Sequence, residues 1–118
     1  MATNITTVSQ AKELVIDPLS AIYADITILK VSSGTTSLSK GALIDVDDTT
    51  GKGGAGSASA PAAVLMEAVS VGASADVVAR CLVHGRVAAS QLSNPVAASI
   101  TLPIRSAARK NGIYIEDI

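Results

Sequence analysis

The sequence predicts a small, mainly β domain, a barrel or a sandwich, with one short C-terminal helix and an extended N-terminal arm. Short runs of aliphatic and β-branched residues alternate with Gly/Ser-rich turns throughout residues 21–118. One segment near the C-terminus carries the signals that begin and end a helix. Residues 1–20 are instead polar and rich in Thr and Ser. We therefore expect a single β-rich domain over residues 21–118, preceded by an arm over residues 1–20.

The composition argues against several classes of protein. A formal net charge of -1 and a pI near 5.6 are unlike those of general nucleic-acid binders, which carry a basic surface. The longest apolar run, residues 61–66, is far shorter than the ~20 residues of a membrane-spanning helix. The N-terminus lacks the pattern of a signal peptide. One cysteine rules out an internal disulfide and suits a reducing cytosol.

The chain is hydrophobic for a small protein that has no membrane segment. Apolar residues make up 48% of it and charged residues only 16%, which indicates apolar surface that another protein chain covers. Aromatic residues are almost absent, with two Tyr and no Phe or Trp, so the core must consist of Val, Ile, Leu and Ala. Sites that stack bases or sugars on aromatic rings are not expected for the same reason.

The first strand is predicted over residues 23–31, where β-forming residues alternate between two faces. A turn follows at residues 32–37, and residues 38–46 predict a turn and then a strand. The Gly/Ser/Ala-rich segment 47–61 is expected to be a flexible surface loop. It matches neither the phosphate-binding loop, in which Lys follows the last glycine, nor the EF-hand loop, which needs Gly and Glu at fixed positions.

Residues 62–71 predict a strand or a pair of strands, and residues 76–87 predict a long strand. Residues 90–95 form a loop, and residues 96–102 are either a strand or the approach to a helix.

Pro103 is suited to the first position of a helix, and residues 104–111 are compatible with two helical turns. Arg109 and Lys110 fall in the last turn, where cations oppose the negative end of the helix. Gly112 is suited to the left-handed cap, and residues 113–118 predict a final strand.

The only cysteine and the only histidine lie three residues apart, in the stretch VARCLVHGRV. In a regular strand Cys81 and His84 point to opposite faces, so they cannot form a nucleophile and base within hydrogen-bonding distance. A zinc site needs about four ligands, and the chain has no second Cys or His. We interpret Cys81 as a small core residue.

His84 is expected on one face with Arg80 and Arg86. Two interpretations of this face stay open: it is solvated, or it contacts an acidic patch on a partner. The acidic residues suggest neither a metal site nor an acid–base pair, because the cluster at Asp45, Asp47 and Asp48 has no second group to complete it. The sequence thus predicts neither an enzyme nor a cofactor.

Several short motifs follow one another in an order that is informative about the family. A Thr/Ser/Gly-rich strand leads to the turn KGAL, and a later strand ends in AVL. The strand VHGRV follows, and a short helix with GIY closes the chain. In this order the sequence resembles the head decoration proteins of tailed bacteriophages, the phage lambda protein D family. The resemblance extends from about Asp25 to Ile115.

The resemblance implies a β-clip or β-tulip-like fold and a homotrimer on the three-fold and quasi-three-fold sites of the mature, expanded capsid. The partner would be the major capsid protein of the same phage, and the protein would stabilise the head against genome pressure. It would be assembled in the host cytoplasm and located on the capsid exterior. Neither nucleic acid nor membrane is an expected partner.

The resemblance also implies an N-terminal arm that becomes ordered against the shell; a terminus without fixed structure is the plainer alternative. The candidate shell-binding residues of the arm are its apolar ones, Ile5, Val8, Leu14, Val15 and Ile16. Two other functions stay open: an oligomeric tail or spike component of a virion, and a small cytosolic enzyme or binding module.

Overall fold

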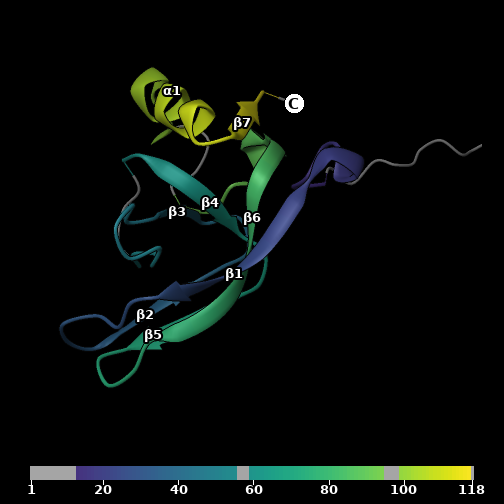
Figure 1. The fold of residues 1–118 in the computed structure, drawn as a ribbon. Coiled ribbons are helices and arrows are strands. Elements are labelled where there is room, and N and C mark those ends of the chain that lie inside the picture. Colours follow the sequence, from purple (N-terminus) through teal and green to yellow (C-terminus); the bar gives the residue numbers. More distant parts are fainter. Residues whose placement is uncertain (1–12, 56–58, 95–98, 118) are drawn as a thin grey trace, which may run out of the picture.

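The computed structural model describes residues 13–55, 59–94 and 99–117 (Figure 1). It confirms the mainly β fold with one short helix near the C-terminus. The helix α1 spans Leu102–Lys110, and two short 3-10 turns, η2 and η3, span Pro18–Ser20 and Ala89–Gln91. The strands are β1 (Ile22–Ile28), β2 (Thr35–Leu38), β3 (Leu43–Asp45), β4 (Pro61–Leu65), β5 (Val69–Gly72), β6 (Val77–Ala88) and β7 (Ile113–Glu116).

The strands form two sheets. The larger has the order β1-β6-β4-β3 in antiparallel pairs, and β7 is added parallel to β6; the smaller consists of β2 and β5. The described strands do not close into a barrel, which is consistent with the sandwich. Figure 1 shows α1 and β7 at one end of the molecule and the β2–β5 pair at the other, with β3, β4 and β6 between them. No described helix is long and apolar enough to cross a membrane.

The larger sheet buries both of its faces. Neighbouring residues of one strand belong to different cores: Leu82 packs in the first core with Ala108 of α1, and Cys81 packs in the second core with Val71 of β5. The first core comprises Leu14, Leu43, Val64, Leu82, Val87, Leu92, Ile100, Ala108 and Ile113. The second comprises Ile28, Leu38, Ala42, Ile44, Ala63, Leu65, Val71, Ala79 and Cys81. The central sheet therefore lies between α1 on one side and the β2–β5 pair on the other.

A bulge in β6 changes which face its side chains reach. Tyr23 lies opposite Leu82 while Ile22 lies opposite His84, so Val83 is an extra residue in β6. Past the bulge, Val87 joins Leu82 in the first core, although their positions differ by five, an odd number that strict alternation would place on opposite faces. The predicted apolar face of residues 76–87 is confirmed through Val83, which packs against the second core, and is wrong beyond it, because one inserted residue exchanges the two faces.

Gly85 makes the bend after the bulge possible. Its φ is +153°, a conformation that side chains rarely adopt, and a Cβ there would lie 3.2 Å from Cδ1 of Leu82. The glycine inside this strand thus marks both an irregular backbone and a close approach to a core side chain.

One local prediction was wrong, and another was confirmed in one of its two alternatives. The predicted turn at residues 32–37 overlaps strand β2, because Thr35–Leu38 pair with Val69–Gly72. The segment 62–71 does contain two strands, but β4 and β5 belong to different sheets. These strands depend on partners that lie far away in the sequence.

The segment around Gly53 is not a free surface loop. The Gly53 N–H donates to the Thr27 carbonyl at 2.8 Å, and its own carbonyl accepts from the Leu29 N–H at 2.9 Å. Gly53 also bridges Val46, so it connects the end of β3 with the end of β1. A Cβ on Gly53 would lie 2.6 Å from Cγ2 of Ile44 and 3.1 Å from Cδ1 of Ile28. Only glycine fits between these two core side chains.

We predict that Gly53→Ala lowers the free energy of unfolding by about 1–3 kcal/mol, because the added methyl group overpacks the second core. Gly54→Ala is the matched control, since a Cβ there meets nothing within 4 Å and the residue has no positive φ. Urea unfolding of both variants measures the difference. Equal stability of the two would contradict the packing role of Gly53.

Candidate interaction surface

The C-terminal end of β6 holds the base of the N-terminal segment. Ala88 N–H donates to the Leu14 carbonyl at 2.9 Å, Ile16 N–H donates to the Arg86 carbonyl at 3.0 Å, and Val15 lies opposite Val87. Residues 14–16, which we call the arm root, thus continue the line of β1 along the same side of β6. The chain leaves this line at η2 and returns to it at Ile22.

Leu14 corrects the predicted boundary of the arm. Its side chain is only 7% exposed and packs in the first core, while Val15 packs against that core and Ile16 is half-buried beside it. Leu14 therefore belongs to the domain and not to an arm that ends at residue 20, because burial in the domain's own core keeps it from a partner. The other two candidate arm residues, Ile5 and Val8, lie outside the described residues.

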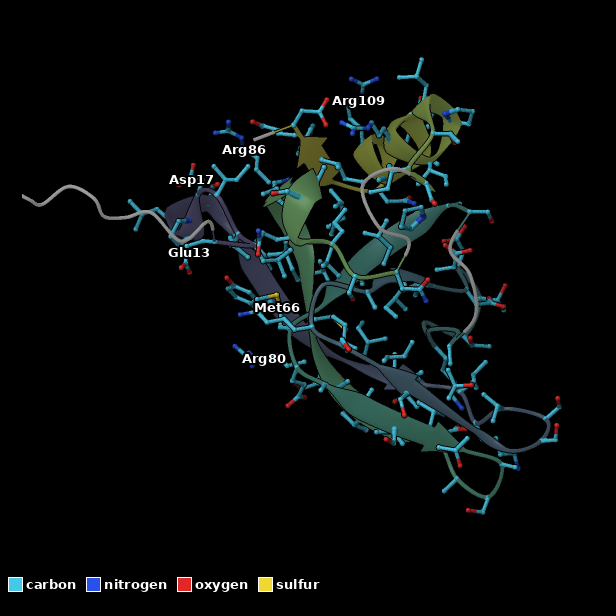
Figure 2. The ribbon with its side chains drawn as sticks, turned by 180° about the vertical axis from the view of Figure 1, so that it is seen from behind. Glu13, Asp17, Met66, Arg80, Arg86 and Arg109 are labelled. Atoms are coloured by element: carbon cyan, nitrogen blue, oxygen red, sulfur yellow. The ribbon has the colours of Figure 1, made fainter. Side chains whose placement is uncertain are left out.

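A pocket of about 510 Å³ opens beside the arm root. Residues far apart in the sequence line it, because the arm root, β1, the turn before β3 and the end of β4 meet here. The lining residues are Glu13, Leu14, Val15, Ile16, Pro18, Tyr23, Lys40, Met66 and Ala88. Figure 2 shows Glu13 and Met66 on the same side of the molecule. The pocket is mostly apolar, and Glu13 and Lys40 supply opposite charges to it.

Arg80, His84 and Arg86 do not form the single face that alternation predicted. Arg80 is two residues before Leu82 and therefore lies on the same face of β6, the one toward the first core. Its guanidinium carbon is 5.5 Å from the centre of the Tyr23 ring. His84 and Arg86 lie beyond the bulge, on the opposite face of β6. His84 makes an edge contact with Tyr114, whose ring centre is 6.3 Å away.

Arg86 is held by Glu116 of β7. The Arg86 Nη2 donates to Glu116 Oε1 at 2.8 Å, and Nε donates to Oε2. This hydrogen-bonded pair raises the pKa of Arg86 and lowers the pKa of Glu116. Because both groups lie at the surface, the pair fixes the position of β7 more than it adds to stability.

Cys81 is a core residue. Its side chain is fully buried, and burial, with smaller contributions from Glu67 and Asp25, raises the pKa of the thiol from 9.0 to about 11. A thiol that stays protonated at neutral pH is a poor nucleophile. The described residues contain no group of three or more His, Cys, Asp and Glu side chains that could hold a metal ion.

The acidic side chains mainly fix loops. Asp45 accepts from the N–H groups of Ser59 and Ala60 at 3.0 Å or slightly more, and Asp47 accepts from those of Thr49 and Thr50. Glu67 accepts from the N–H of Arg80 at 2.8 Å. These carboxylates replace missing backbone partners and do not gather into a site.

A second depression, a groove of about 520 Å³, lies between α1 and β7. Leu102, Arg105 and Arg109 line it from α1, and Tyr114 and Glu116 line it from β7. Sequence reasoning missed this groove. Arg109 and Lys110 in the last turn of the helix could have indicated it, but from the sequence they were explained only as charges that oppose the helix dipole. A comparison of the sequence with known protein families and with curated proteins found no match.

We predict that Leu14→Ala lowers the free energy of unfolding by about 2–3 kcal/mol, because it removes a buried side chain from the first core. Leu19→Ala, five residues further on, is the control: Leu19 is 98% exposed, so its loss should leave stability unchanged. Thermal unfolding of the two variants tests the assignment. If the Leu14 variant were as stable as the wild type, residues 14–16 would have to be assigned to the arm and not to the domain.

Cys81 gives a pH-dependent prediction. Its pKa is higher in the folded protein than the ordinary value of 9.0, so the folded state keeps the proton that the unfolded state loses. The contribution is fully present below pH 9 and is lost as the pH rises toward about 11. The free energy of unfolding of the wild type should therefore fall more steeply over this range than that of Cys81→Ala. Urea unfolding at several pH values measures both slopes, and equal slopes would contradict the assignment.

Proposed function

We propose that the protein is a bacteriophage head decoration protein, which binds the expanded capsid as a homotrimer and stabilises the head from outside. The observation that carries this proposal is the arm root. Residues 14–16 are bound to β6 and to the first core, so the described part of the chain begins at a fixed position beside an apolar pocket. A fixed base lets a terminal segment reach one particular place on a partner. The ordered motifs described above support the same proposal.

Stabilisation by such a protein follows from linkage. A ligand that binds the expanded shell, and not its ruptured form, stabilises it by ~2.7 kcal/mol per site when the free ligand is at a hundredfold excess over Kd. A trimer engages three copies of its target at once, so that moderate affinity per subunit is sufficient. The function needs a folded domain with binding surfaces and no catalytic group.

The exposed apolar side chains support contact with other chains. Leu19 and Ile22 lie at η2 and the start of β1, and Val78 lies at the start of β6. The outer edge of β1 is unpaired between Ile22 and Ile26 within the described residues, whereas Thr27 is already bonded to Gly53. An open strand edge flanked by apolar side chains is a surface that another chain can cover.

One observation favours a second function, that of a small binding module. The pocket at the arm root falls within the range of volumes that bind small molecules, about 300–1,000 Å³. Its only charged side chains, Glu13 and Lys40, are at least partly exposed, so a ligand would be recognised mainly by its apolar surface. A thermal shift on adding an apolar ligand would support this function.

We predict that the purified protein sediments with expanded shells of its phage and not with unexpanded precursors. Deleting residues 2–12 should leave the unfolding temperature unchanged, because the domain begins at the arm root, and should weaken binding to the shell. Sedimentation of shells with increasing protein concentration measures the affinity.

Two outcomes would count against the proposal. Absence of the wild-type protein from the pellet of expanded shells would contradict the function as a whole. Unchanged affinity for the shell after deletion of residues 2–12 would show that the arm does not contribute to binding. The shorter deletion is essential, because removing residues up to 20 would delete the arm root itself, including the buried Leu14.

A further inference from the structure

The arm root and strand β7 flank the same residues of β6. Leu14 and Ile16 bond to Ala88 and Arg86 on one side of β6. On its other side, Gly85–Ala88 pair with Ile113–Glu116. Adjacent strands lie about 4.8 Å apart, so roughly 10 Å separate the arm root from β7. A partner that residues 1–12 bind close to the arm root therefore also lies next to the α1–β7 end of the molecule.

The groove between α1 and β7 combines exposed apolar side chains with cations. Leu102 at the start of α1 is 80% exposed and Tyr114 is 40% exposed, and both line the groove. Arg105 and Arg109 line it between them. Figure 2 shows Arg109 at the same end of the molecule as Arg86 and Asp17. Exposed apolar residues ringed by guanidinium groups are typical of an interface core with a charged rim.

The charges of this end are not balanced. Arg86 pairs with Glu116, and Arg105 Nη2 pairs with Asp117 Oδ1 at 2.6 Å. These pairs use both acids of the segment 102–117, which leaves Arg109 and Lys110 without an ion pair among the described residues. The whole chain has a net charge of -1, so the positive charge is a local property of the last turn of α1.

We propose that the α1–β7 groove binds an acidic segment of the shell subunit that carries a large apolar side chain. The apolar side chain packs between Leu102 and Tyr114, and the carboxylates face Arg109, while Lys110 adds positive charge next to the groove. This inference rests on the proposed function, and it adds to the arm a second contact at the same end of each subunit. Two contacts on one rigid body raise the affinity above that of either alone.

The charge argues against other occupants. The segment outside the structure, residues 1–12, contains no acid and one Lys, so it does not complement the groove. Nucleic acid is a poor occupant because the chain has a net charge of -1. Two unpaired cations are too few to bind a polyanion against that overall repulsion. A second copy does offer acids beside exposed apolar side chains, Asp17 with Leu19 and Asp76 with Val78, so this occupant is an outcome of the test below.

The test is sedimentation with empty, nuclease-treated expanded shells. Arg109→Glu should raise the Kd for the shell about tenfold at low salt and less at high salt, because the lost attraction is screened. Leu102→Ser should weaken binding at every salt concentration, since it removes an apolar anchor. Both positions are exposed, so the variants should keep the wild-type circular dichroism spectrum. Lys30→Glu is the matched charge reversal, because Lys30 is exposed and adjoins Val31, which bonds to Gly72 of β5 at the opposite end.

The outcomes separate the inference from the function on which it rests. If the wild type does not bind expanded shells, the function fails and the inference with it. If the wild type binds and Arg109→Glu and Leu102→Ser bind equally well, the groove is not the shell contact and only the inference is overturned. A change in the solution mass of Arg109→Glu would overturn it too, because the groove would then be a contact between copies. An equally large loss of shell affinity in Lys30→Glu would also overturn it, because the effect of Arg109→Glu would then come from the overall charge of the protein.

Discussion

The fold depends on how β6 shares its side chains between two cores. A strand with strict alternation offers each face every second residue along its whole length. In β6, Ala79 and Cys81 face the second core, Leu82 faces the first, and after the extra residue Val83 the first core receives Val87 as well. Without this bulge Val87 would point away from α1, and the C-terminal half of β6 would lose its buried face. Gly85 supplies the backbone conformation that the change requires.

The two cores also account for much of the hydrophobic composition. A sheet covered on one face needs apolar residues at alternate positions, whereas Ala63, Val64 and Leu65 of β4 are all buried. The apolar surplus that indicated a covering chain is thus used largely inside the domain. Contact with a partner has to be argued from particular surfaces, namely the arm root, the open edge of β1 and the groove between α1 and β7.

Signals contained in a few consecutive residues predicted the structure well. Pro103 lies in the first turn of α1, and Gly112, at a φ of +95°, follows its end, while alternation up to Cys81 placed that residue in the core. What failed depended on distant partners. Thr35–Leu38 form a strand only against β5, and Gly53 is buried only because Thr27 and Leu29 lie beside it. The groove was missed for a related reason: only Asn111 and Gly112 separate α1 from β7, but the position of β7 beside α1 depends on its pairing with β6, far away in the sequence.

The order of strands along β6 has a consequence for binding. The arm root and β7 are both hydrogen-bonded to Arg86–Ala88, and Arg86 is also tied to Glu116 by its side chain. A force applied to residues 1–12 passes through Leu14 and Ile16 directly to this part of β6, without involving the β2–β5 pair. A partner held by the arm and the groove therefore pulls on one short, doubly paired piece of sheet that is packed against α1. Antiparallel pairing on one side and parallel pairing on the other share the load between two ladders, which fits the proposed attachment to a capsid shell.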